Sequence, residues 1–159
     1  GAARAIGIKA AIRGAKRITV VNRTVEKAEG LAEDINKIAA AGADAAGIED
    51  FKKSRAIGDY DVIVNTTSVG MYPDVDSSPL DDMTAFEKGK IVYDVIYNPF
   101  KTRFLLMAEK MGCKTLNGLG MLINQGIGAY EIWTGIKVSE EITRGMHEAL
   151  AKYLENTRG

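Results

Sequence analysis

Cysteine, net charge and long apolar runs are all scarce in this chain of 159 residues, and each scarcity excludes a class of protein. A single cysteine forms no internal disulfide and fits a reducing compartment, so we expect a cytoplasmic protein. The 21 basic residues balance 21 acidic ones, which gives no electrostatic argument for binding nucleic acid or an anionic membrane. No apolar run approaches the roughly 18 residues of a membrane-spanning helix, and we expect no signal peptide.

The apolar residues that are present, 46% of the chain, suffice for one ordinary core, so we expect one domain over residues 1–159. Apolar and β-branched stretches predict strands at residues 17–21, 61–65 and 91–95, with a short strand at 114–116 and an edge strand at 45–48. Helical periodicity predicts helices around residues 3–10, 24–39, 49–55, 104–112 and 119–133, with a terminal helix at 138–156. Strands that alternate with helices predict an α/β fold of the Rossmann-like kind, a doubly wound parallel sheet covered on both faces.

The tripeptide Asn22-Arg23-Thr24 ends the first of these strands, where a dinucleotide-binding fold inspects the adenosine ribose of its cofactor. An acidic residue at this place selects NAD, whereas an arginine pairs with the 2′-phosphate of NADP. Lys27 adds a second cation one helical turn further on. Taken alone, Arg23 is better explained as a solvated surface arginine than as a phosphate contact. Three further segments of the sequence favour the phosphate contact.

Those segments follow later predicted strands and span residues 65–71, 93–99 and 117–125. Their sequences are Asn-Thr-Thr-Ser-Val-Gly-Met, Tyr-Asp-Val-Ile-Tyr-Asn-Pro and Asn-Gly-Leu-Gly-Met-Leu-Ile-Asn-Gln. With the tripeptide, and in this order, they closely resemble the cofactor-binding half of the shikimate dehydrogenase family. Each segment alone is a weak signal. Residues 66–68, for example, are equally well explained as a turn whose hydroxyls bond their own backbone.

The resemblance implies NADP as cofactor and assigns roles to individual positions. Contact with the 2′-phosphate is implied for Asn22, Arg23, Thr24 and Lys27, where Lys27 replaces a basic residue that is commonly arginine. The cofactor's ribose and nicotinamide are implied to lie against Thr67, Ser68, Val69, Val95, Gly118 and Met121. Binding of the shikimate hydroxyls and carboxylate is implied for Tyr97 and Gln125. Independently, an uncharged amide such as Gln125 among apolar residues is expected to need hydrogen-bond partners.

The chain departs from the family at its phosphate-binding turn. The family has a strand, then Gly-Ala-Gly-Gly-Ala, then a helix, whereas this sequence starts at Gly1-Ala2 and matches only the end of that turn. We therefore expect Gly1 and Ala2 to offer backbone N–H groups to a pyrophosphate, with the first strand and the N-terminal substrate domain lacking. In the family that domain holds a catalytic lysine–aspartate pair, so we assign no catalytic residue and no metal ligand here, and expect the chain alone to be inactive.

The implied parent enzyme reduces 3-dehydroshikimate to shikimate with NADPH, on the route to chorismate and the aromatic amino acids. Alternatives are a quinate/shikimate dehydrogenase, a methylene-tetrahydrofolate-dehydrogenase-like protein and, for the isolated chain, a non-catalytic nucleotide-binding module. The expected partner is a small-molecule substrate, with neither nucleic acid nor a membrane. A homodimer is compatible with the sequence but not specified by it.

Three other features have structural interpretations. Cys113 is expected to be a small buried side chain, and His147, the only histidine, a solvated surface residue. The last helix is expected to carry its apolar residues on one face, at Ile142, Met146, Ala149, Leu150 and Tyr153.

Overall fold

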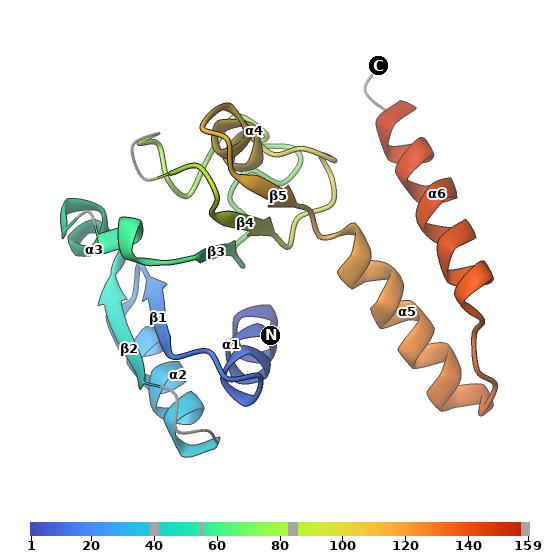
Figure 1. The fold of residues 1–159 in the computed structure, drawn as a ribbon, viewed down its shortest axis with the longest axis horizontal. Helices are drawn as coiled ribbons and strands as arrows, with labels where there is room; N and C mark the ends of the chain where they lie inside the picture. Colours follow the sequence, from blue (N-terminus) through green and yellow to red (C-terminus); the bar gives the residue numbers. More distant parts are fainter. Residues whose placement is uncertain (39–41, 55, 83–85, 157–159) are drawn as a thin grey trace. The chain divides into compact units, whose positions relative to one another are not determined.

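The computed structural model describes residues 1–38, 42–54, 56–82 and 86–156. These residues form two compact units, Gly1–Asp59 and Tyr60–Gly159, each of which combines helices with a parallel sheet (Figure 1). The α/β prediction is therefore confirmed. Residues 39 and 55, which the sequence placed in two helices, lie outside the described part of the chain. Within that part, no helix is both long and apolar enough to cross a membrane.

The first unit surrounds a two-stranded parallel sheet. Its elements are α1 (Ala2–Ile12), β1 (Arg17–Asn22), α2 (Val25–Ile38), β2 (Gly42–Gly47), α3 (Ile48–Ser54) and a 3-10 helix (Ala56–Asp59). Strands β1 and β2 run in register from Arg17 opposite Gly42 to Asn22 opposite Gly47. The core centres on Ile35 of α2, which is completely buried and packs with Ala11 of α1.

Helix α1 approaches α2 closely because it carries glycine at the contact. A Cβ atom on Gly7 would lie 2.8 Å from the Cδ1 atom of Ile35, a distance shorter than real contacts allow. The absence of a side chain at position 7 thus lets the buried isoleucine occupy the space between the two helices.

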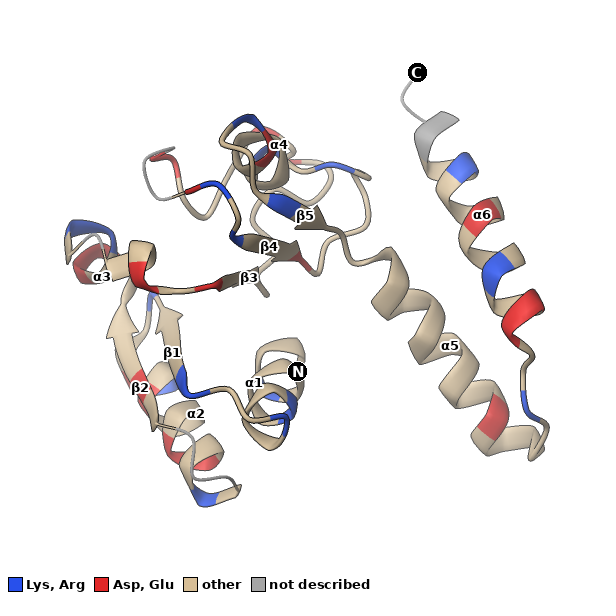
Figure 2. Ribbon diagram, in the orientation of Figure 1, with Lys and Arg blue, Asp and Glu red and all other residues tan. Residues whose placement is uncertain are grey.

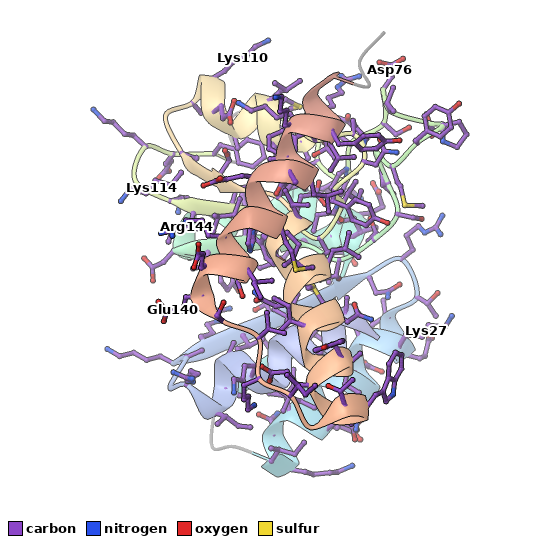
Figure 3. The ribbon with its side chains drawn as sticks, turned by 90° about the vertical axis from the view of Figure 1, so that its right-hand side faces the viewer. Lys27, Asp76, Lys110, Lys114, Glu140 and Arg144 are labelled. Atoms are coloured by element: carbon purple, nitrogen blue, oxygen red, sulfur yellow. The ribbon has the colours of Figure 1, made fainter. Side chains whose placement is uncertain are left out.

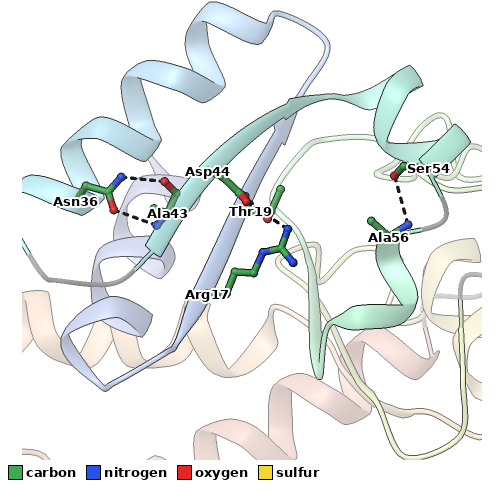
Figure 4. A network of polar contacts seen from close by, with 7 residues as sticks. All are labelled: Arg17, Thr19, Asn36, Ala43, Asp44, Ser54 and Ala56. Atoms are coloured by element: carbon green, nitrogen blue, oxygen red, sulfur yellow. Dashed lines mark hydrogen bonds and ion pairs between the residues drawn. The ribbon is translucent and has the colours of Figure 1, made fainter.

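Strand β2 begins three residues earlier than predicted, at Gly42 rather than Ala45. The side-chain amide of Asn36 explains the extension. Its Nδ2 donates to the carbonyl oxygen of Ala43 (2.8 Å), and its Oδ1 accepts from the Ala43 N–H (2.9 Å; Figure 4). Asp44 accepts hydrogen bonds from Arg17 and Thr19, which ties β2 to β1 on the sheet surface. These polar contacts specify a strand in a Gly/Ala segment of weak strand propensity.

The second unit contains a three-stranded parallel sheet in the order β3-β4-β5. Its elements are β3 (Val62–Asn65), β4 (Ile91–Asp94), α4 (Arg103–Lys110), β5 (Lys114–Leu116), α5 (Leu119–Thr134) and α6 (Glu140–Asn156). Val62 lies opposite Ile91, which lies opposite Lys114. Because all three strands are parallel, the loops that follow them lie at one edge of this sheet, where α/β proteins bind ligands.

Aromatic and aliphatic side chains fill the core beside this sheet. The rings of Phe86 and Phe104 pack edge to face, with centroids 5.6 Å apart, and Val92 of β4 is completely buried. Cys113 is also buried, as predicted, and its burial raises the pKa of its thiol. A raised pKa keeps the thiol protonated and poorly reactive, which fits a packing role.

Helices α5 and α6 differ in charge and in what they bury. Helix α5 carries one charged residue, Glu131, whereas charges of both signs occur along α6 (Figure 2). Three of the apolar residues that the sequence placed on one face of α6 are exposed: Ile142 at 57%, Met146 at 41% and Tyr153 at 65%. His147, which the sequence predicted to be a solvated surface residue, is half-buried. Its Cε1 atom lies 3.6 Å from where a Cβ of Gly120 would be, so this side of α6 faces α5.

Candidate functional site

The end of β1 presents two free cations beside a tight polar turn. The Oδ1 atom of Asn22 accepts from the backbone N–H of Thr24 (3.0 Å), and the N–H of Lys27 donates to the Thr24 carbonyl (3.2 Å). Arg23 and Lys27 are exposed, and neither side chain bonds to another residue in the described ranges. Figure 3 shows Lys27 extending away from its helix. Both cations are therefore available to an anion without breaking an existing ion pair.

Gly1 and Ala2 begin α1. Gly1 occupies the N-cap position and makes no side-chain cap hydrogen bond. Its carbonyl accepts from the Ala5 N–H (3.1 Å), the first bond of the helix. The N–H groups of the first turn have no intrahelical acceptor, and with the helix dipole they favour an anion.

In the second unit, the loop after β3 is a closed hydrogen-bonded turn. The Oδ1 atom of Asn65 accepts from both the N–H (3.0 Å) and the hydroxyl (2.8 Å) of Thr67. The Thr67 hydroxyl oxygen in turn accepts from the Val69 N–H (3.1 Å). The hydroxyl of Thr67 thus serves its own backbone, whereas Ser68 is exposed and its hydroxyl has no partner among the residues described. The loop offers Ser68 and Val69 to a ligand, with Thr67 as their support.

The loops after β4 and β5 meet directly at Val95 and Gly118. The Gly118 N–H donates to the Ile96 carbonyl (3.0 Å), and a Cβ atom on Gly118 would lie only 1.8 Å from the Val95 carbonyl oxygen. Position 118 therefore requires glycine. The structure thus brings together the two residues that the sequence predicted to line one wall.

Met121 and Gln125 follow on α5 with a spacing of four residues, which places them on one helix face. Met121 is half-buried and Gln125 is exposed. Because Gln125 is exposed, water or a ligand can supply the hydrogen-bond partners that its amide is expected to need. Tyr97 is 40% exposed. The amide and the phenol are both accessible to a polar ligand.

The sequence did not single out Asp94, which links these loops. Asp94 is completely buried at the end of β4 and accepts hydrogen bonds from Asn65 Nδ2 (3.1 Å), the Ile96 N–H (3.0 Å) and Thr102 Oγ1 (2.7 Å). Burial raises the pKa of Asp94, and the three hydrogen bonds oppose that rise. Strand register could have revealed the pair, because Asn65 and Asp94 are opposite one another at the ends of β3 and β4.

Comparison with known proteins shows which family this chain is similar to. Residues 118–150 match a family model described as the Shikimate 5'-dehydrogenase C-terminal domain. The NADP(+) shikimate dehydrogenase of Methanopyrus kandleri is 42% identical over 154 residues, which cover 97% of this chain and 52% of that protein. The chain is a relative of shikimate dehydrogenase. The resemblance inferred from the four sequence segments is confirmed.

Solved structures of this kind of dehydrogenase have the same fold. Shikimate 5-dehydrogenase from Listeria monocytogenes, in complex with shikimate and NAD, is 40% identical with a TM-score of 0.84; the match covers 94% of this chain and 52% of that one. Quinate dehydrogenase from Corynebacterium glutamicum, in complex with NAD, is 26% identical with a TM-score of 0.83, over 96% of this chain and 52% of that one. This chain spans about half the length of the shikimate dehydrogenases it matches.

Proposed function

We propose that this chain is the NADP-binding domain of a shikimate dehydrogenase, which reversibly reduces 3-dehydroshikimate to shikimate. The observation that carries the proposal is that Arg23 and Lys27, around the turn at the end of β1, are exposed and have no side-chain partner among the residues that the structure describes. A ribose with a free 2′-hydroxyl would leave both cations without a partner. A 2′-phosphate pairs with the planar guanidinium at two oxygens and with the ammonium as a point charge.

The second unit supplies the surfaces for the reacting groups. We assign the ribose and nicotinamide contacts to Thr67, Ser68, Val69, Val95, Gly118 and Met121, and the pyrophosphate contact to the N–H groups at Gly1 and Ala2. The missing side chain of Gly118 lets the Val95 backbone pack against it, and its N–H is already bonded, so Val95 and Gly118 together offer a chemically inert surface to a ring. NADPH, when bound, supplies the hydride.

Substrate recognition is assigned to Tyr97 and Gln125. The exposed phenol can donate to or accept from a substrate hydroxyl, and the exposed amide can donate to a carboxylate. A general acid from elsewhere in the full-length protein delivers the proton to the ketone oxygen, so we expect the 159-residue chain alone to be inactive. We place the protein in the cytoplasm, acting on a small molecule; a homodimer is compatible with this function but not required by it.

One observation favours a second candidate, a quinate/shikimate dehydrogenase that uses NAD. Two structural neighbours, one of them a quinate dehydrogenase, hold NAD. The cofactor experiment separates the two candidates, because Arg23 and Lys27 contribute binding energy only when a 2′-phosphate is present.

The test is a fluorescence titration of the chain with NADPH and, in parallel, NADH. We expect NADPH to bind more tightly, and Arg23→Asp to weaken NADPH binding by about 10–100-fold, the equivalent of charge-assisted hydrogen bonds worth about 1.5–3 kcal/mol. NADH affinity should change little. The matched control is Gln125→Ala, which should keep the NADPH preference and instead raise the KM for shikimate in the full-length protein.

Equal losses for the two cofactors in Arg23→Asp would refute the phosphate assignment. Tighter binding of NADH by the unmodified chain would favour the second candidate. Full-length protein that binds NADPH but oxidises neither shikimate nor quinate would reduce the function to nucleotide binding.

A further inference from the structure

The carboxylate of Asp94 lies where three separate segments converge. Asn65 comes from the end of β3, Ile96 from the loop after β4, and Thr102 from the N-cap of α4. Each donates one hydrogen bond, and no water reaches Asp94 because its exposed fraction is zero. A buried carboxylate is tolerated only when such bonds replace its hydration, so the three donors and Asp94 specify one arrangement of the segments.

One branch of this network leads to the proposed cofactor loop. The Nδ2 atom of Asn65 donates hydrogen bonds to Asp94 (3.1 Å) and to the Val69 carbonyl (3.4 Å), and these two bonds fix the orientation of the amide. Its Oδ1 is then aimed at the N–H and hydroxyl of Thr67, and the Thr67 hydroxyl holds the Val69 N–H. The order of contacts runs from Asp94 through Asn65 and Thr67 to Val69.

The other branch leads to the proposed substrate and nicotinamide surfaces. The N–H of Ile96 is held by Asp94, and its carbonyl accepts from Gly118 at the start of α5. The Ile96 side chain is itself only 4% exposed. With both backbone groups and the side chain of Ile96 fixed, the position of the next residue, Tyr97, is fixed as well.

We propose that Asp94 is a positioning residue for ligand binding, which holds the Thr67–Val69 loop, Tyr97 and Gly118 in the arrangement that binds cofactor and substrate. The inference rests on the proposed function. The backbone bonds that pair β3 with β4 do not depend on this carboxylate. Its removal therefore disturbs the loops more than the sheet.

An asparagine at position 94 separates this role from simple stability. Its Oδ1 can accept from Asn65 and Ile96 as the carboxylate does, and its Nδ2 can donate to Thr102, whose hydroxyl is both donor and acceptor. Asp94→Asn keeps the loop contacts without the charge, whereas Asp94→Ala removes all three acceptor contacts. Val92→Ala is the matched control, because it leaves a cavity at a completely buried position on the same strand and touches none of these hydrogen bonds.

The experiment makes three kinds of measurement on each variant of the full-length protein: NADPH affinity, the steady-state kinetics with shikimate (KM and kcat), and hydrogen exchange of the Val69 and Ile96 amides. The temperature is set well below each variant's Tm, so that unfolded protein does not contribute to the measured values. A displacement of catalytic or binding groups by about 1 Å can lower the reaction rate by about 100-fold. We therefore expect Asp94→Ala to lower kcat/KM and NADPH affinity by about 10–100-fold. Faster exchange at Val69 and Ile96 should accompany the loss.

Asp94→Asn should remain within about threefold of the unmodified protein, and Val92→Ala should lose stability but keep affinity and kcat/KM. Asp94→Ala with unchanged affinity and kcat/KM would overturn the inference while the proposed function stands. Equal losses in Val92→Ala and Asp94→Ala would also overturn it, in favour of a purely structural role. If the unmodified protein acts on no shikimate and binds no NADPH, the proposed function fails, and the positioning role fails with it.

Discussion

Replacement of Gly118 by alanine should destabilise the second unit severely. The added Cβ atom would lie 1.8 Å from the Val95 carbonyl oxygen and 2.4 Å from its carbon. These are backbone atoms, so no rotamer change relieves the clash. Cβ contacts below 3.0 Å are essentially never found, and an opening of about 1.2 Å between the loops after β4 and β5 is therefore required.

That opening removes the Gly118 N–H to Ile96 carbonyl bond, which is 3.0 Å long. Strain from an overfilled contact costs about 1–3 kcal/mol, and a buried hydrogen-bonding group left without a partner costs a further 1–3 kcal/mol or so. We expect Gly118→Ala to lower the free energy of unfolding by about 2–6 kcal/mol, a large share of the roughly 5–15 kcal/mol of an ordinary domain.

Urea unfolding followed by far-UV circular dichroism measures this loss, as a lower midpoint at unchanged slope. Tryptophan fluorescence is a poor probe here, because the only tryptophan, Trp133, is 83% exposed. The matched control is Gly128→Ala in the same helix, where a Cβ meets nothing within 4 Å; it should raise stability by about 1 kcal/mol through helix propensity. A Gly118→Ala protein within about 0.5 kcal/mol of the unmodified chain would refute the steric argument.

Two further predictions concern stability alone. Asn36→Ala removes both bonds to Ala43 and should lower the free energy of unfolding by about 1–3 kcal/mol, with faster hydrogen exchange at the Ala43 amide; unchanged exchange there would contradict the assignment. Glu109 has its pKa lowered by its hydrogen bond to Lys101 and, to a lesser extent, by that to Thr115. Its charge therefore stabilises the fold above the ordinary glutamate pKa of 4.5, and this contribution disappears as the pH falls through the lowered value. The unmodified protein should accordingly be more stable than Glu109→Gln at pH 7 and lose that advantage below pH 4.5, as urea midpoints across this range would measure; a pH-independent difference would argue against the ion pair.

The strands that could be predicted are those with strong local signals. Residues 114–116 were placed correctly because turn residues bound the segment on both sides. Strand β2 was misplaced because Gly42–Gly47 contains no β-branched residue, and its register comes from β1 and from the amide of Asn36. Such tertiary contacts override propensity and leave no local pattern.

The candidate site shows the same division. The segments that follow β1, β3, β4 and β5 were found from sequence because ligand-binding residues of α/β folds occur at strand ends. Asp94 was missed as a determinant because it lies inside the strand predicted at residues 91–95, and the strand pattern does not show which partners its side chain has. Its three donors come from positions 65, 96 and 102, and only the folded register brings them together. The exposure of Ile142 and Tyr153 on α6 could not be predicted for a related reason: periodicity indicates that a helix is amphipathic, but not where its neighbour lies.

The contact between Asn36 and Ala43 also protects an exposed edge of the two-stranded sheet. In a parallel strand, the N–H and C=O of one residue point to the same side, so Ala43 directs both groups away from β1. Open strand edges recruit strands from other molecules and promote aggregation. At the start of β2 the first donor and acceptor are already occupied by a side chain of the same chain, which blocks intermolecular strand addition there.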